Sequence, residues 1–299
     1  MEARTVTVQR SVGLGDMLLS TCATWRYARD TGRTLVIDWR RSLYAPRDQN
    51  LFTLLFEEAS EWLGVPVHIA RPDEVPVDPE PTEIEDESAA GEEACALVEK
   101  GVDLDRRHVV WRGCLAPTHP PQREMAALLS ALSPLPDRAD ALASARRQLL
   151  GTGPSIGVHL RHGNGGNILD HTHWWDDGLA VHRVVETIRE ARAVIGADAP
   201  VVVCTDSREV LDAMTSLVPG VRAVEKHWRT PGDGDLHLWA GAPESLAETF
   251  VEMFLLAHTT VLIRMPPRSY FSAPAAFMKK PAPRELLHRH PPVPSPGVW

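Results

Sequence analysis

The fold is decided by one stretch, Ser155-Ile-Gly-Val-His-Leu-Arg-His-Gly-Asn-Gly-Gly-Asn167. Its apolar run, Ile156 to Leu160, follows Gly153-Pro154 and is typical of a buried strand in a parallel sheet. The stretch ends in glycines, which let the backbone turn sharply and approach a ligand closely. In open α/β sheets, ligands bind at the carboxyl ends of the strands. The stretch therefore predicts a parallel α/β sheet with a ligand site at this strand end.

The side chains at this strand end suit an anionic ligand. His159, Arg161 and His162 stand between the strand and the glycine turn. A guanidinium is a planar fork that makes bidentate, charge-assisted hydrogen bonds to a phosphate. Spacing alone leaves a second interpretation equally open, in which Arg161 forms a structural ion pair and the glycines only make a turn.

The segment HLRHGNGGNILDH, residues 159–171, resembles the HxRHGNG segment of the bacterial nodulation fucosyltransferases (NodZ). More distantly, it is similar to the α1,6-fucosyltransferases that modify N-glycan cores. In that family the strand-end arginine binds the diphosphate of GDP-fucose, so the resemblance implies this role for Arg161. It also implies substrate-binding positions at neighbouring residues, namely His159, His162, Gly163 and Asn164.

The first 40 residues predict a βαβ unit. A strand over residues 5–9 leads through Gly-Leu-Gly-Asp16 to a helix over 17–30 and a second strand over 34–39. The glycines could cradle a phosphate, but the spacing is not GxGxxG and Asp16 would repel an anion, which favours a tight turn. The segment from Gly13 to Tyr44 also resembles the opening of NodZ, where this half faces the acceptor side of the cleft. Arg40, Arg41 and Tyr44 would then line that cleft, although Arg41 could equally be a solvated basic residue after the strand.

The rest of the first half predicts helices over residues 52–63, 125–132 and 139–150, and strands over 65–69 and 108–111. Residues 72–93 are rich in Asp, Glu and Pro and predict a solvated loop, because such a composition cannot bury a core. A surface loop is favoured there over an acceptor lid.

The second half repeats the βαβ pattern, with predicted helices over residues 179–195, 210–218 and 245–258 and strands over 200–206, 221–224 and 260–263. A chain of 299 residues is long enough for two domains. Gly151-Thr-Gly-Pro154 is the expected boundary, giving an acceptor-side domain, 1–150, and a nucleotide-sugar domain, 151–299. The predicted fold is α/β, with two Rossmann-like domains facing each other across a cleft, and the resemblance implies the same architecture (GT-B).

Polar residues at three strand ends of the second half complete the predicted site. CTDSREVLD, from Cys204, resembles the second motif of the family, and MFLLAHTTVLIRMPPRSYF, from Met253, resembles the third. The resemblance implies that Asp206 contacts the nucleotide and Ser269 the phosphate and sugar. The alternative for Asp206 is a helix N-cap, a role that Ser207 could fill instead. The other predicted substrate-binding residues are Ser207, His237, Glu252 and Arg264.

An inverting transfer needs a base that takes the proton of the acceptor hydroxyl. Asp170, His171 and His173 are the candidates near the glycine turn, and we select Asp170 because the family carries an acid at nearly this spacing from Arg161. A helix-start role for Asp170 is almost as well supported. We identify no DxD pair of the sort that would hold a divalent cation, and the resemblance implies a metal-independent enzyme, so no metal and no cofactor besides the sugar-nucleotide substrate are expected. Arg161 would neutralise the leaving diphosphate.

Composition narrows the class of protein. A formal charge of −9 argues against nonspecific nucleic-acid binding. The four cysteines form no CxxC pair and predict buried thiols. No signal h-region and no run of 18 apolar residues occurs, so we expect a cytoplasmic protein without a membrane span. The Pro- and His-rich tail, residues 281–299, predicts a surface segment.

The resemblance implies an inverting glycosyltransferase that moves fucose from GDP-fucose to a hydroxyl of a glycan or glycosylated acceptor, in an α1,6 linkage. Two departures from the family keep alternatives open: Gly166-Asn167 replace an acidic pair, and Glu252 replaces an aspartate. One alternative is a glycosyltransferase that uses another nucleotide sugar on a small molecule or peptide. The other is a non-catalytic protein that binds a nucleotide sugar.

Overall fold

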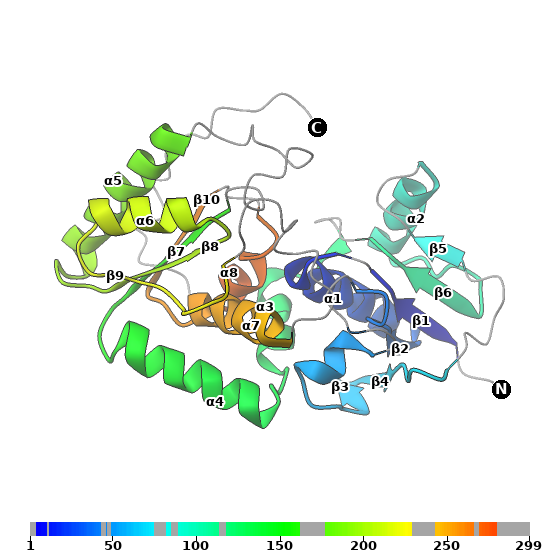
Figure 1. The fold of residues 1–299 in the computed structure, drawn as a ribbon. Helices are drawn as coiled ribbons and strands as arrows, with labels where there is room; N and C mark the ends of the chain where they lie inside the picture. Colours follow the sequence, from blue (N-terminus) through cyan, green and yellow to red (C-terminus); the bar gives the residue numbers. More distant parts are fainter. Residues whose placement is uncertain are drawn as a thin grey trace.

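Two α/β units, each built on a parallel sheet, make up the protein (Figure 1). The computed structural model describes residues 4–10, 12–42, 46, 49–74, 82–84, 89–113, 118–161, 177–228, 243–265 and 269–279. One sheet uses strands from the first half of the chain and the other uses strands from the second half, which confirms the predicted α/β class. No helix in these ranges is both long enough and apolar enough to cross a membrane.

The first sheet has the strand order β3-β4-β2-β1-β6-β5. Its strands are β1 (Thr5–Val8), β2 (Thr34–Ile37), β3 (Glu61–Trp62), β4 (Val65–Ile69), β5 (Thr82–Ile84) and β6 (His108–Trp111). All neighbours pair in parallel except β3 and β4, which form an antiparallel pair. In β1, β2 and β6 every second residue is fully buried, because successive side chains point to opposite faces of a sheet.

Helix α1 (Leu14–Thr31) joins β1 to β2 and begins three residues before the predicted start. It ends at Gly32, which adopts a left-handed conformation with a φ of 66° and donates its N–H to the carbonyls of Ala28 and Arg29. Thirteen of its 18 residues are buried, so α1 is a central element of the first half.

Two predictions for the first half are wrong. Residues 52–63 do not form a helix: a short 3-10 helix, η1 (Leu51–Leu54), is followed by β3. Leu63 and Gly64 both have positive φ, which closes a tight turn between β3 and β4 and is incompatible with a helix. The acidic stretch 72–93 is not a loop throughout, since it includes β5 and the start of α2 (Ala89–Glu99). Pairing of β5 with β6 supplies the long-range hydrogen bonds that composition cannot reveal.

The second sheet has the order β10-β7-β8-β9, with all strands parallel. Its strands are β7 (Ile156–Leu160), β8 (Val201–Thr205), β9 (Val221–Arg222) and β10 (Val261–Met265). Every residue of β7 and β8 is buried, as their continuous apolar runs predict. Helices α5 (Asp177–Ile195) and α6 (Arg208–Leu217) cover one face and form a separate core with it.

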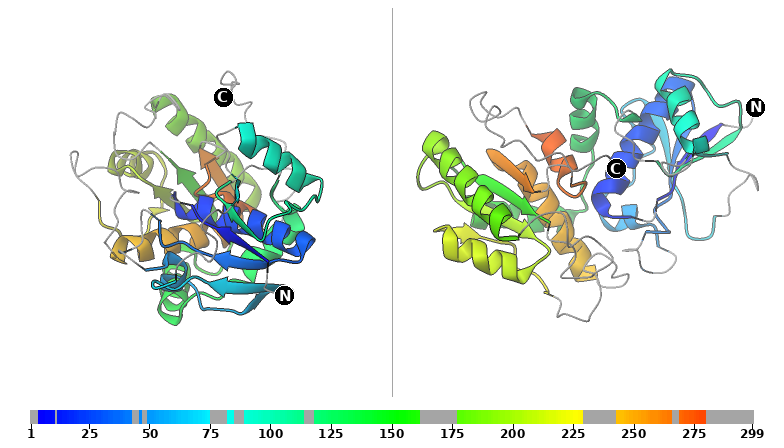
Figure 2. Two further views of the ribbon diagram at one scale, coloured as in Figure 1. Left: turned by 90° about the vertical axis from the view of Figure 1, so that its right-hand side faces the viewer. Right: turned by 90° about the horizontal axis from the view of Figure 1, so that it is seen from above.

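The remaining helices are α3 (Gln122–Ser130), α4 (Pro136–Ala145, continued by a π-helical turn, Arg146–Leu150), α7 (Pro243–Ala257) and α8 (Ala273–Met278), and α4 packs against α7. Helix α8 contacts α1, α3 and α7, and Figure 2 shows it between the two halves. Phe56, from the first half, packs edge-on against Phe250 and Phe254 of α7. One hydrophobic core therefore continues from the first sheet to the near face of the second. The domain boundary at residue 150 stays a prediction.

Candidate active site

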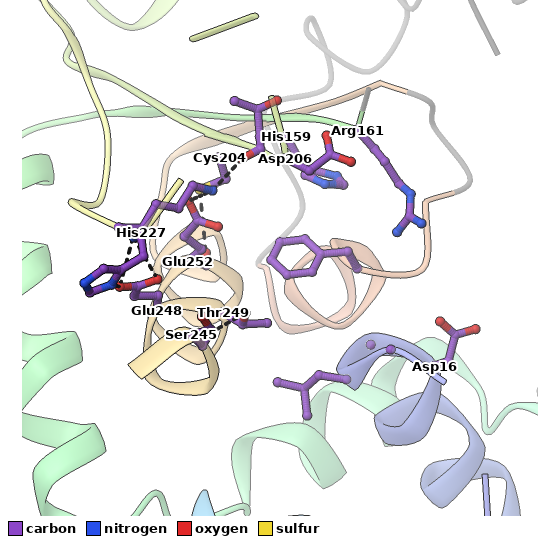
Figure 3. A pocket seen from close by; sticks show the side chains of 16 residues that line it. Asp16, His159, Arg161, Cys204, Asp206, His227, Ser245, Glu248, Thr249 and Glu252 are labelled. Atoms are coloured by element: carbon purple, nitrogen blue, oxygen red, sulfur yellow. Dashed lines mark hydrogen bonds and ion pairs between the residues drawn. The ribbon is translucent and has the colours of Figure 1, made fainter. Parts of the chain in front are cut away.

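A pocket lies where the two halves of the chain meet (Figure 3). The start of α1 and the residue before it form one wall, with Gly13, Leu14, Gly15 and Asp16. The opposite wall comes from the second half: the ends of β7 and β8, the segment after β9, one face of α7, and Phe271. A pocket built from both halves is typical of ligand sites between α/β domains.

Register in the second sheet brings the predicted strand-end residues together. Leu160, the last residue of β7, pairs with Thr205 of β8, so Arg161 and Asp206 leave the sheet at the same edge. On the other side of β7, the backbone N–H of Arg161 donates to the Met265 carbonyl at 2.8 Å, which fixes the start of its loop. Both Arg161 and Asp206 line the pocket. The structure therefore brings two of the three predicted strand ends together at the pocket.

His159 lines the same pocket as a buried, neutral side chain. Its Nδ1 lies 2.9 Å from the Ser272 hydroxyl, and its ring packs on Phe271 with 4.9 Å between centroids. Burial lowers the pKa of His159 to about 3, and the nearby cations Arg161 and Arg264 act in the same direction, against Asp206. His159 thus offers hydrogen bonding and an apolar ring face, and Arg161 supplies the positive charge.

Arg264, predicted to bind substrate, lies behind the pocket wall. Its Nε donates to the Ser272 hydroxyl at 2.9 Å, and its terminal nitrogen donates to the Ser269 carbonyl at 2.6 Å. Burial lowers its pKa to about 10, so it stays charged at neutral pH. Arg264 belongs to β10 and therefore links this strand to the segment before α8. Its contact with the Ser272 hydroxyl is shared with His159.

Ser207 and Ser269 are also buried and do not belong to the pocket lining. The Ser207 hydroxyl accepts the N–H of Val210 at 3.3 Å and caps α6, the role weighed above for this position. The Ser269 hydroxyl has no hydrogen-bond partner among the described residues. The Ser207 hydroxyl also donates to Glu209 Oε2 at 3.2 Å, so of these two only Ser269 has a donor without a partner among the described residues.

Glu252 takes part in an ion pair at the pocket wall. Its Oε1 accepts from Lys226 Nζ at 2.9 Å, and both side chains are only 9% exposed. Lys226 Nζ also donates to the Thr205 carbonyl and lies 4.6 Å from the centre of the Trp228 ring. Burial acts to lower the pKa of Lys226, but Glu252 more than offsets this, so the pKa is raised. The pair fixes the end of β8, next to Asp206, to α7.

Sequence reasoning missed most of the polar wall that α7 provides. Ser245, Glu248, Thr249 and Glu252 all line the pocket, and their spacing places them on one face of the helix. Glu248 accepts from His227 Nδ1 at 2.7 Å and from the His227 backbone N–H. The signal was present in the sequence, because these four polar residues recur at i, i+3, i+4 and i+7, and every residue between them and after them in the helix is apolar.

Several predicted site residues lie outside the described part of the chain: His162, Gly163, Asn164, Asp170 and His237. Their placement, and the choice of Asp170 as base, stay predictions. Arg40 is described but does not line the pocket. It pairs with both carboxylate oxygens of Asp38 at 2.8 Å and donates to the carbonyls of Arg71 and Glu74. Its role is therefore to hold the segment after β4, and the expectation that it lines the cleft is wrong.

Two parallel-sheet units that share one pocket, with an arginine at a strand end, define the architecture of a GT-B glycosyltransferase. The family model of nodulation protein Z (NodZ) matches residues 2–76 and 96–284. The chain therefore belongs to the nodulation protein Z family, which confirms the resemblance seen in the sequence.

Relatives of known sequence and structure agree. A nodulation protein Z of Azorhizobium caulinodans is 34% identical over 291 residues, covering 91% of this chain and 88% of that protein. Its counterpart in Bradyrhizobium diazoefficiens is 32% identical, covering 90% and 77%. The crystal structure of NodZ α-1,6-fucosyltransferase soaked with GDP-fucose is 27% identical, with a TM-score of 0.75 and 93% of both chains covered. POFUT1 in complex with GDP shares the fold, at 12% identity and a TM-score of 0.54.

Proposed function

We propose that the protein is a fucosyltransferase that transfers fucose from GDP-fucose to a hydroxyl of a glycan acceptor, in an α1,6 linkage. The observation that carries this function is the pocket itself, where Arg161 and Asp206 leave adjacent strands at one edge of the sheet. This is the position where α/β sheets bind nucleotides. Family membership over most of the chain supports the same donor and the same reaction.

Each side chain has a role that its surroundings suit. Arg161 neutralises the diphosphate as the bond to fucose breaks, since a guanidinium makes bidentate bonds to phosphate oxygens. Asp206 accepts hydrogen bonds from the nucleoside, and neutral His159 donates or accepts one without adding charge. The Lys226–Glu252 pair holds the end of β8 in place for Asp206.

The acceptor and the compartment belong to the proposal as well. A 6-linked product requires an acceptor sugar with a free 6-hydroxyl, which must enter between the second-half wall and α1. We propose that the reaction takes place in the cytoplasm. Besides the acceptor, the donor nucleotide sugar is the only small-molecule partner that the reaction needs.

Calorimetry and thermal shift with GDP, UDP, TDP, GDP-fucose and GDP-mannose test the donor site. GDP-fucose should bind and stabilise selectively, and Arg161→Ala should weaken its binding about 10- to 100-fold, the loss expected for hydrogen bonds to a charged group. Arg189→Ala, on the exposed side of α5, removes the same charge away from the pocket and should leave binding unchanged.

A transfer assay with short glycans that carry a free 6-hydroxyl tests the reaction. Release of GDP coupled to a fucosylated product is the expected result. Tighter binding of another nucleotide would assign the protein to a different donor, and binding of GDP-fucose without any turnover would make it a non-catalytic member of the family.

A further inference from the structure

The proposed reaction needs a base, and an acid at the start of α1 lines the pocket. We infer that Asp16, in the first turn of α1, is the general base that takes the proton of the acceptor hydroxyl. The inference rests on the proposed function, because it names a residue that acts in the same transfer.

The position of Asp16 is the first argument. Figure 3 shows the Arg161 guanidinium pointing from the end of β7 toward the start of α1, and the Asp16 carboxylate pointing up from α1 on the opposite wall. In a displacement with inversion, the nucleophile enters on the side of the sugar opposite the leaving group. Because Arg161 marks the diphosphate side, the acceptor hydroxyl enters from the α1 side, where Asp16 is placed.

A close backbone contact holds Asp16 in this position. A side chain at Gly15 would lie 2.7 Å from the Tyr270 carbonyl carbon and 2.9 Å from Phe271 Cα, so the first turn of α1 lies directly against the main chain of the second half. Phe271 in turn packs on His159, two residues before Arg161. The start of α1 and the end of β7 are therefore held on opposite sides of the pocket by packed groups.

The other described acids of the pocket come from the second half of the chain. Glu252 is paired with Lys226, and Glu248 accepts two hydrogen bonds from His227. Asp206 lies on the same sheet edge as Arg161, on the leaving-group side. Among the described acids of the pocket, Asp16 alone comes from the first half.

The atoms of the step balance as follows. The bond between C1 of fucose and the diphosphate oxygen breaks, and its electron pair stays on that oxygen, beside Arg161. The acceptor oxygen forms the new bond to C1, and its proton moves to the Asp16 carboxylate. No metal or other co-reactant is required.

The test compares two nucleophiles in the wild-type protein and in Asp16→Asn. Transfer to a 6-hydroxyl glycan, or to water, needs a base, and its rate should fall about 10²- to 10⁴-fold in the variant. Azide is already an anion and needs no base, so formation of fucosyl azide from GDP-fucose should stay within about threefold of wild type. Affinity for GDP, measured by calorimetry, should be unchanged.

Two further variants keep the result interpretable. Asp30→Asn changes an exposed acid in the last part of the same helix and should leave all three readings at wild-type values. Asp16→Glu restores a carboxylate and should recover part of the transfer rate. If Asp16→Asn transfers fucose at the wild-type rate, or loses azide reaction and transfer equally while still folded, Asp16 is not the base. If the wild-type protein neither binds nor turns over GDP-fucose, the proposed function fails and the inference fails with it.

Discussion

Gly15 lies so close to the main chain of Tyr270 that no residue with a side chain fits at position 15. A Cβ at Gly15 would stand 2.7 Å from the Tyr270 carbonyl carbon, and main-chain atoms cannot swing away as the end of a long side chain can. The two residues belong to different halves of the chain, and the contact sits at the rim of the pocket. The glycine in the first turn of α1 is therefore required for the approach of the two halves.

Gly15→Ala should destabilise the protein by about 1–3 kcal/mol, the usual cost of forcing extra volume into a packed site. It should also lower the transfer rate, because α1 must move away from Arg161. Urea denaturation and the transfer assay measure the two effects. Gly153→Ala is the matched control, since a Cβ there meets nothing within 4 Å, and its stability should match wild type. Equal stability of both variants would contradict the contact.

Replacing one partner of the Lys226–Glu252 pair should lower the free energy of unfolding strongly. Lys226→Met leaves a buried carboxylate without its partner, which typically costs about 3–5 kcal/mol. The double variant Lys226→Met/Glu252→Gln should lose less than the sum of the two single changes, and a double-mutant cycle measures this coupling. As a comparison, Arg208→Ala breaks an ion pair whose side chains are about 60% exposed and should cost less than about 1 kcal/mol. Additive single changes would show that the pair is not coupled.

His159 should make the protein sensitive to acid. Burial lowers its pKa from 6.5 to about 3, so between these values the unfolded chain binds a proton that the folded protein does not. Unfolding then takes up a proton, and the free energy of unfolding must fall as the pH is lowered through this window. In His159→Gln the slope of stability against pH between 4 and 6 should be smaller by up to about 1 kcal/mol per pH unit. An unchanged slope, measured by chemical denaturation at several pH values, would mean that His159 is protonated in the folded state.

Phe56 should matter to both halves of the chain. Its ring packs at 5.8 Å from Phe250 and 6.1 Å from Phe254, measured between centroids, in the core that both halves share. Phe56→Ala should therefore cost about 3–5 kcal/mol, and unfolding should stay a single transition. Circular dichroism and tryptophan fluorescence should report the same midpoint. Two separate midpoints would show that the halves unfold independently.

Local sequence determined much of the second sheet and the edge where the site lies. The continuous apolar runs of β7 and β8 have no alternative to a buried strand, and parallel pairing then places Arg161 and Asp206 at one edge. The same reasoning gave a wrong helix for residues 52–63. Their apolar residues lie in a 3-10 helix and a hairpin, which packing stabilises.

Only the tertiary structure decided which polar groups meet in the pocket. Lys226 forms an ion pair with Glu252, which lies 26 residues further along the chain. Asp16 lies on the wall of the pocket opposite Arg161, although the sequence indicates only that Asp16 belongs to a tight turn. The reason is physical. Hydrophobic periodicity reports whether a residue is buried within its own element, whereas contacts between distant elements depend on how whole helices and sheets pack.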